Sequence, residues 1–181
     1  NGCPPVVITG GQRVGGQTSI DCSVSSQYLS ALLLIAPCLD HGLVIDVVQG
    51  PVSKPYIDMT VDIMNAFGIE LTQSGHTHFE VPGRQTYQAG NHHVEPDGSQ
   101  AGYFWAAAAI TSTRVKVHGV TRASRQGDVG LANVFAQMGC SVEYGTDGIA
   151  VTGGDLAAVE VDMGNMPDVV PTLAVAAAYA R

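Results

Sequence analysis

The spacing of apolar residues in the first half of the chain predicts a strand and a helix, then a second strand and helix, and finally two short strands. Alternating apolar and polar residues indicate a half-buried strand, whereas apolar residues three and four apart indicate a helix. The strands are expected at residues 18–22, 43–48, 69–72 and 78–81, and the helices at residues 28–35 and 55–67. Ser23 or Ser25 is the expected N-cap of the first helix, and Gly68 is expected to end the second.

The same order of elements returns in the second half of the chain. The expected strands lie near residues 93–95 and at 114–118, 141–144 and 149–152, and the expected helices at 99–110 and 128–138. Aligning residues 65–71 with residues 136–142 places one helix end against the other. The chain therefore contains an internal duplication with a period of roughly 70 residues. A third copy is expected to begin with a strand at 159–162 and a helix after Asp168.

This organisation predicts an α/β (α+β) fold of repeated βαβαββ units, with helices packed beneath sheets and two part-domains. Residues 83–91 are the expected hinge, because domain boundaries fall in polar segments that contain glycine. Residues 1–90 are expected to hold the end of a first domain with one full unit. Residues 91–181 are expected to hold the start of a second domain, with one full unit and the beginning of another. Since the chain begins at Asn1 rather than Met and ends on a helical run without a capping glycine, we interpret it as an internal segment.

Composition and charge exclude several classes of protein. The chain is 45% hydrophobic and only 13% charged, which is typical of a soluble globular protein and not of a disordered one. The net charge is −8 and the eight basic residues are scattered, so nucleic acid is not an expected partner. The longest apolar stretch, residues 28–39, is too short to span a bilayer, so no membrane partner is expected. The four cysteines show no CxxC spacing, which favours reduced thiols in a cytoplasmic protein.

Hydroxyl groups stand at two predicted strand-to-helix junctions. The first junction carries Ser25, Ser26 and Gln27, and the second carries Ser53 and Tyr56 around the cation Lys54. Hydroxyls, a carboxamide and unpaired amides at a helix start can hold a phosphate without many cations. Serine N-caps without a ligand explain each junction equally well, but two such junctions in one unit favour an anionic ligand.

An acidic residue, Asp168, is expected in the first turn of the helix that opens the third copy. The helix dipole alone explains an acid at this position, and a catalytic carboxylate is the alternative. The six histidines show no metal-binding spacing and are interpreted as surface residues. The glycine pairs at 10–11 and 15–16 match no nucleotide-binding motif and are interpreted as turns.

Motifs spread over the whole chain resemble those of the 5-enolpyruvylshikimate-3-phosphate (EPSP) synthase family, in the same order. They are Asn1-Gly2-Cys3-Pro4-Pro5, Val24-Ser25-Ser26-Gln27-Tyr28-Leu29, Ser53-Lys54-Pro55-Tyr56-Ile57-Asp58, Gln126-Gly127-Asp128 and Pro167-Asp168. Chains of that family are more than twice as long, so the resemblance covers their middle. The related UDP-N-acetylglucosamine enolpyruvyl transferase shares the fold, but the Ser-Ser-Gln-Tyr and Ser-Lys-Pro-Tyr motifs belong to the shikimate branch.

The resemblance implies transfer of an enolpyruvyl group from phosphoenolpyruvate to the 5-hydroxyl of shikimate 3-phosphate, in a cleft between two domains and without metal or organic cofactor. By motif position, Ser25, Ser26 and Ser53 would bind the shikimate phosphate. Gln27 would contact both substrates, and Tyr56 would pack on the shikimate ring. Asp168 would bind substrate and would take and return protons at the reacting groups.

Few basic residues accompany these motifs, although two phosphates and two carboxylates need neutralising in the reaction. Only Lys54 belongs to a site motif. A module that binds shikimate 3-phosphate without turnover is therefore the alternative function. An incomplete third unit would also leave the helix of Leu173, Val175 and Ala178 uncovered, which predicts self-association or a complementary chain segment.

Overall fold

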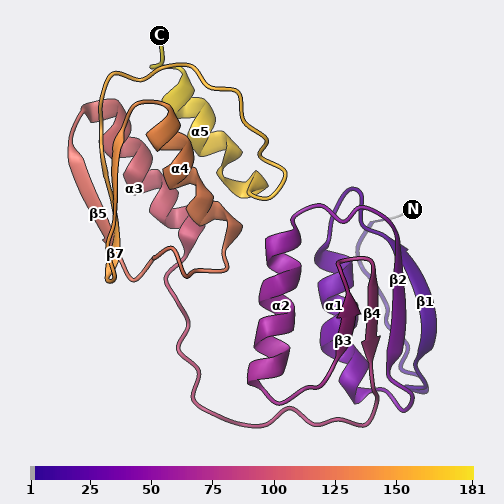
Figure 1. The fold of residues 1–181 in the computed structure, drawn as a ribbon. Coiled ribbons are helices and arrows are strands. Elements are labelled where there is room, and N and C mark those ends of the chain that lie inside the picture. The colour runs from indigo at the N-terminus through magenta and orange to yellow at the C-terminus, as the bar shows by residue number, and fades with distance from the viewer. Residues whose placement is uncertain (1–2) are drawn as a thin grey trace.

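The computed structural model describes residues 3–181 as two units, each with its own sheet and hydrophobic core (Figure 1). Residues 82–97 connect the units without forming a helix or strand. The first part of this connection stays on the first unit, where the Tyr87 hydroxyl donates to the Leu34 carbonyl over 2.9 Å. The Phe67 and His92 rings also lie 5.6 Å apart. The chain therefore leaves the first unit only near the end of the connection.

The first unit is a four-stranded sheet with two helices on one face, in the order β1-β2-β4-β3. Its elements are β1 (Gly16–Asp21), α1 (Gln27–Ile35), β2 (Leu43–Gln49), α2 (Lys54–Ala66), β3 (Thr72–Ser74) and β4 (His78–Val81). Strands β1 and β2 run parallel, and the other neighbours are antiparallel. Alternate side chains of β2 are buried, because only one face of the sheet meets the helices. Ile45, Ile57 and Phe79 are fully buried in this core.

The second unit is a three-stranded antiparallel sheet, in the order β5-β7-β6, with α3 and α4 packed on one face and α5 packed against α3 (Figure 1). Its elements are α3 (Gly98–Thr111), β5 (Arg114–His118), α4 (Leu131–Gln137), β6 (Ser141–Tyr144), β7 (Gly148–Thr152) and α5 (Val170–Ala177). Short 3-10 turns, η2 (Gly127–Gly130) and η3 (Pro167–Val169), precede α4 and α5. The indole of Trp105 is fully buried and donates to the Ile149 carbonyl over 3.3 Å. This second core is separate from the first.

The structure confirms the internal repeat. The order helix, strand, helix, strand, strand recurs, and β2, β4 and β3 pair in the same way as β5, β7 and β6. Helices α2 and α4 are each followed by a glycine with positive φ, 79° at Gly68 and 103° at Gly139. Glycine adopts this conformation without steric cost, and it ends a helix at the same point of each unit. The α/β class and the repeated order of elements were thus predictable from hydrophobic spacing.

Two predicted strands are absent from the structure, and a third lies later in the chain than predicted. Residues 93–95 form no strand and lie in the connection, with Val94 80% exposed. Residues 159–162 form none either, although Val159 and Val161 pack against the second core. Neither segment has a neighbouring strand to bond with among residues 3–181, and a strand needs such a ladder. The strand expected at 69–72 begins only at Thr72, because the Ile69 amide still bonds to the end of α2.

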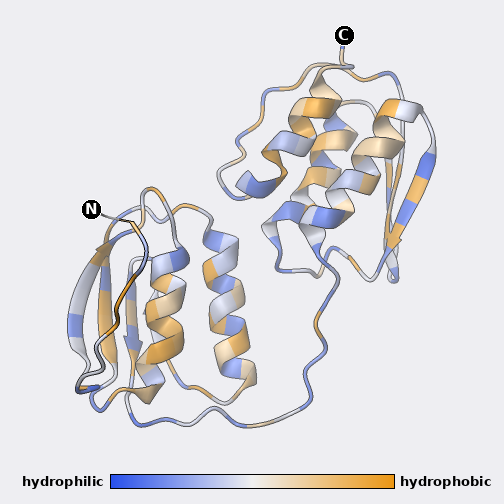
Figure 2. Ribbon diagram, turned by 180° about the vertical axis from the view of Figure 1, so that it is seen from behind, coloured by the Kyte–Doolittle hydropathy of each residue, from blue (hydrophilic) through white to orange (hydrophobic). Residues whose placement is uncertain are grey.

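Two smaller predictions also need correction. The N-cap of α1 is Ser26, not Ser23 or Ser25. Leu173 of α5 is not uncovered but packs against the second core, whereas Val175 is 56% exposed and Ala178 is exposed. Colouring by hydropathy shows apolar residues on the helices of both units (Figure 2). No helix in the described residues is long and apolar enough to cross a membrane.

Candidate active site

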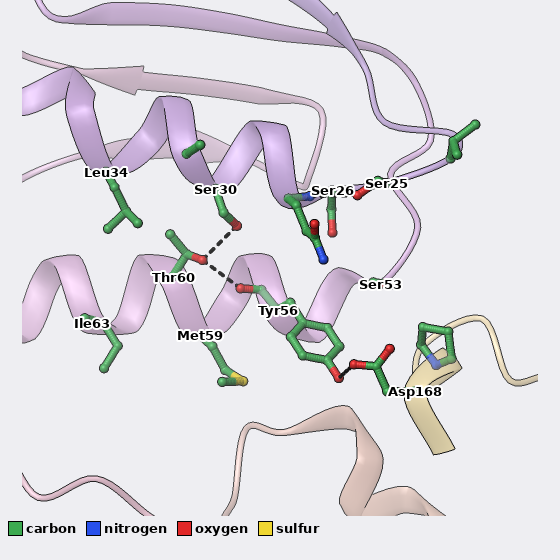
Figure 3. Close-up of a pocket in the computed structure, with 14 residues that line it drawn as sticks. Ser25, Ser26, Ser30, Leu34, Ser53, Tyr56, Met59, Thr60, Ile63 and Asp168 are labelled. Atoms are coloured by element: carbon green, nitrogen blue, oxygen red, sulfur yellow. Dashed lines mark hydrogen bonds between the residues drawn. The ribbon is translucent and has the colours of Figure 1, made fainter. Parts of the chain in front are cut away.

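Two helix N-termini of the first unit lie side by side and present their serines to the same space (Figure 3). Ser26 is the N-cap of α1 and is 4% exposed, and Ser53 is the N-cap of α2. Neither serine side chain caps its own helix. The Ser25 hydroxyl instead accepts a hydrogen bond from the Gln27 amide over 3.2 Å. The positive end of a helix dipole and hydroxyls that cap no helix are groups that bind an anion.

The backbone at Ser53 is unusual, with φ of 55° in the left-handed region. A residue with a side chain adopts this conformation at some cost, and such residues cluster at binding sites. The Ser53 amide donates to the Gly164 carbonyl of the second unit over 3.2 Å. This contact fixes the start of α2 against the loop that leads into η3.

A pocket of about 700 Å³ brings together all six residues predicted to form the site. These are Ser25, Ser26, Gln27, Ser53, Tyr56 and Asp168. The end of the pocket at the helix starts is polar, and side chains of α1 and α2 such as Leu34 and Ile63 continue it as an apolar groove (Figure 3). The sequence could not show that three segments distant in the chain meet here. Each site residue predicted from the sequence nevertheless lines this pocket.

Asp168 comes from the second unit and reaches Tyr56 of the first. The Tyr56 hydroxyl donates to Asp168 Oδ2 over 3.2 Å, as the dashed line in Figure 3 shows. Asp168 lies in the short turn η3, which precedes α5, and is exposed to solvent in the pocket. The carboxylate is thus held at the pocket mouth without being removed from water.

A second carboxylate, Asp128, also accepts from Tyr56, and sequence reasoning gave it no role. The Tyr56 hydroxyl lies 2.8 Å from Asp128 Oδ2, and the Ser99 hydroxyl bonds to the same oxygen. Asp128 is 1% exposed, in the turn η2. The motif Gln126-Gly127-Asp128 was the available signal, because it contributes to the resemblance.

Burial and these carboxylates raise the pKa of Tyr56 well above its ordinary range. The largest cause is burial of the phenol, followed by its hydrogen bond to Asp128 and the negative charges of Asp128 and Asp168. Each cause disfavours the phenolate. Tyr56 is therefore a neutral hydrogen-bond donor at any physiological pH.

Glycine at position 127 allows close packing at the site, chiefly within the second unit between η2 and the segment that precedes η3. A Cβ atom on Gly127 would lie 2.1 Å from the Asn165 carbonyl oxygen and 3.1 Å from Pro55 Cγ. The first distance is far shorter than a van der Waals contact, and a backbone atom cannot move aside as the end of a side chain can. The site geometry therefore depends on a residue without a side chain between η2, η3 and α2.

Asp168 is the one charged side chain among the described residues that line the pocket. Lys54 is exposed and does not line it, although it is the first residue of α2. An anion in this pocket would thus be held by hydroxyls, amides and helix dipoles of the first unit.

The histidines and cysteines lie away from the pocket lining. His76 bonds to Asp58 at 2.8 Å, and His78 lies 2.7 Å from Asp46 and 3.0 Å from Glu80. No cluster of three or more metal-binding side chains is present among residues 3–181. The four cysteines are free, two exposed and two buried.

A βαβαββ unit meets, at a pocket, a second unit that repeats its order without the first strand. This arrangement defines the class of protein, and the fold is that of the enolpyruvyl transferases. The solved EPSP synthase from Acinetobacter baumannii matches with a TM-score of 0.71 and 26% identity, over 99% of this chain and 42% of that one. The enolpyruvyl transferase NikO from Streptomyces tendae matches with a TM-score of 0.73 and 19% identity, over 94% of this chain and 43% of that one. At this low identity the second match shows the fold alone.

The family model of EPSP synthase (3-phosphoshikimate 1-carboxyvinyltransferase) matches residues 1–181, so the chain belongs to the EPSP synthase family. The 3-phosphoshikimate 1-carboxyvinyltransferase of Klebsiella pneumoniae (strain 342) is 45% identical over 179 residues. That of Pseudoalteromonas atlantica is 45% identical over 181 residues. The chain spans 42% of the length of each of these relatives. The resemblance predicted from the motifs is therefore confirmed.

Proposed function

We propose that this chain carries part of the active site of an EPSP synthase, which transfers the enolpyruvyl group of phosphoenolpyruvate to the 5-hydroxyl of shikimate 3-phosphate and releases phosphate. The observation that carries the proposal is that all six residues predicted from the family motifs line one pocket. We further propose that residues 1–90 belong to a first domain and residues 91–181 to a second, with the reaction in the cleft between them.

In this proposal, Ser25, Ser26 and Ser53 bind the phosphate of shikimate 3-phosphate. Their positions at two helix starts support the role, because the positive ends of both helix dipoles lie at the pocket. Hydrogen bonds from hydroxyls to a charged phosphate are worth about 1.5–3 kcal/mol each. Their neutral donors would compensate for the lack of a cation among the described residues that line the pocket.

Gln27 and Tyr56 orient the substrates. Gln27 is exposed at the pocket wall, so its carboxamide is free to reach a ligand in the pocket. Tyr56 is held through its hydroxyl, which leaves its ring to pack on the carbon skeleton of shikimate. Phosphoenolpyruvate would lie beside Gln27, toward the second unit.

Asp168 acts as the proton acceptor and donor of the reaction. A general base needs to lie within hydrogen-bond reach of the hydroxyl that attacks. The carboxylate stands at the pocket mouth, and its hydrogen bond to Tyr56 sets its direction without occupying both oxygens. It would take the proton of the attacking 5-hydroxyl while the methylene carbon of phosphoenolpyruvate gains a proton, which gives a tetrahedral adduct. Removal of a proton from the new methyl group would then accompany cleavage of the C–O bond to phosphate and release of phosphate.

A binding module without turnover is the second candidate. The observation that favours it is that the described residues lining the pocket include no Lys or Arg. Stabilising phosphoenolpyruvate and its transition state normally requires several cations. Under this reading the chain holds shikimate 3-phosphate, and activation of the second substrate requires residues from another chain segment.

The exposed apolar residues of α5 support a further part of the proposal, that another surface covers this helix. Val175 is 56% exposed and Tyr179, just beyond the helix, is 60% exposed. A second copy of the chain or a complementary chain segment would bury them. A concentration-independent monomer mass in sedimentation would contradict self-association.

Phosphate release tests the proposed reaction. The chain is mixed with shikimate 3-phosphate and phosphoenolpyruvate, together and singly, and compared with Asp168→Ala and with Glu160→Ala, an exposed acidic residue outside the pocket. Release that needs both substrates, is lost in Asp168→Ala and persists in Glu160→Ala supports the transferase. Binding of shikimate 3-phosphate without release by the wild-type chain supports the module instead.

A further inference from the structure

We infer that Asp128 is a positioning residue of this site: with Ser99 it holds the hydroxyl of Tyr56 across the junction of the two units, so that the Tyr56 ring and Asp168 face the same ligand. The inference rests on the proposed function for the identity of that ligand. The interaction itself is a property of the protein alone.

The geometry joins the two units through one hydroxyl. Tyr56 belongs to α2 of the first unit, whereas Ser99 and Asp128 belong to α3 and η2 of the second. The Tyr56–Asp128 bond of 2.8 Å is shorter than the 3.2 Å bond to Asp168. A tyrosine has a single hydroxyl hydrogen, so Asp128 is the principal acceptor and Asp168 the weaker one.

The buried carboxylate of Asp128 contributes little to the stability of the fold. It is 1% exposed, and its Oδ1 atom has no hydrogen-bond partner among residues 3–181. An unpaired polar atom in the interior is unfavourable, and an apolar side chain of similar size would often be tolerated at such a place. A buried carboxylate here is explained better by the groups it orients, Tyr56 and Ser99, than by packing.

The bond to Asp128 restricts both the position and the partner of Tyr56. With Asp128 present, the ring is fixed at the pocket wall and Asp168 keeps one oxygen free of Tyr56 for substrate. Without Asp128, the hydroxyl would bond only to Asp168, so the ring would shift toward η3. Asp128 would thus affect substrate binding without touching substrate, because it does not line the pocket.

Calorimetric titration with shikimate 3-phosphate tests whether Asp128 acts through Tyr56. We expect Asp128→Ala and Tyr56→Phe each to weaken binding about tenfold, and the double variant to be no weaker than either single one. Asp128→Asn keeps an oxygen acceptor for the hydroxyl and should stay within about threefold of wild type. A double variant about a hundredfold weaker, or Asp128→Ala binding as wild type does, would overturn the inference. Asp128→Leu, of similar volume, replaces Asp128→Ala if that variant does not fold.

A second measurement needs no ligand and separates this inference from the proposed function. The chain is labelled with 3-fluorotyrosine, and the fluorine resonance of Tyr56 among the six tyrosines is assigned by its loss in Tyr56→Phe. We expect this resonance alone to move in Asp128→Ala or Asp128→Leu, and to remain near its wild-type position in Asp128→Asn. An unmoved Tyr56 resonance would show that Asp128 does not hold the tyrosine. If wild type binds no shikimate 3-phosphate, the proposed function fails and the fluorine spectrum still decides the role of Asp128.

Discussion

Tyr56 and Asp168 are 112 positions apart in the chain, yet the hydroxyl of the first lies 3.2 Å from a carboxylate oxygen of the second. The two residues come from different units, on helix α2 and in the turn η3. The pocket that they share is therefore complete only while the units are in contact. Substrate binding and the approach of the two units should depend on each other.

Gly127→Ala should distort the second unit where it forms its side of the site. The new Cβ would meet the Asn165 carbonyl at 2.1 Å, so the backbone has to move. We expect a loss of about 1–3 kcal/mol in the free energy of unfolding and weaker binding of shikimate 3-phosphate. Urea denaturation and calorimetry measure the two effects. Gly130→Ala is the matched control, since its Cβ meets only the flexible Met166 side chain at 3.2 Å, and a similar loss there would contradict this explanation.

Ser26→Ala should weaken binding of shikimate 3-phosphate without unfolding the chain. Its hydroxyl makes no capping bond to α1 and faces the pocket. Removing the hydroxyl should therefore lower the affinity for a ligand more than the stability of the helix. We expect a loss of about tenfold in affinity, the value of one hydrogen bond to a charged group. Ser23→Ala, in the same loop but outside the pocket lining, should bind as wild type does. Equal affinities for all three proteins would exclude a phosphate contact at Ser26.

His78 should make stability depend on pH. Its hydrogen bonds to Glu80 and Asp46 raise the pKa of this imidazole above the ordinary 6.5. The folded state therefore binds the proton more tightly than the unfolded state, and the resulting stability is present below pH 6.5 and lost as the pH rises through the raised pKa. The difference in Tm between wild type and His78→Gln should be larger at about pH 5.5 than at about pH 8.5. A difference independent of pH would contradict the prediction.

The two separate cores predict two unfolding transitions. Phe79 is fully buried in the first core, and Trp105, the single tryptophan, is fully buried in the second. Phe79→Ala should destabilise the first unit by about 3–5 kcal/mol. Circular dichroism should then show an earlier transition, while the midpoint seen by tryptophan fluorescence changes little. Equal shifts in both signals would show that the units unfold as one.

Local patterns predicted most elements of this fold because their causes are local. Apolar spacing and a following glycine define α2 and α4, and both end where Gly68 and Gly139 adopt positive φ. Residues 93–95 and 159–162 were misassigned because a strand depends on a neighbour that its own sequence does not reveal. Their composition suits a strand, but no ladder forms on them in residues 3–181.

The sequence identified a site residue only where a helix start or a family motif indicated a chemical role for it. Ser25 and Ser53 stand out because each precedes a helix, and Asp168 because of the family motif. Asp128 does not stand out, since an acid after a glycine is typical of a turn or a helix start. Its importance comes from being buried beside Tyr56, 72 positions away, which only the folded chain reveals.

Titration of the chain with shikimate 3-phosphate and, separately, with shikimate tests the central claim most directly. If Ser25, Ser26 and Ser53 form a phosphate site, shikimate 3-phosphate should bind at least about a hundredfold more tightly than shikimate, the value of two hydrogen bonds to a charged group. Ser26→Ala should reduce this preference. Equal affinity for both compounds, or no binding of either, would contradict the assignment of this pocket.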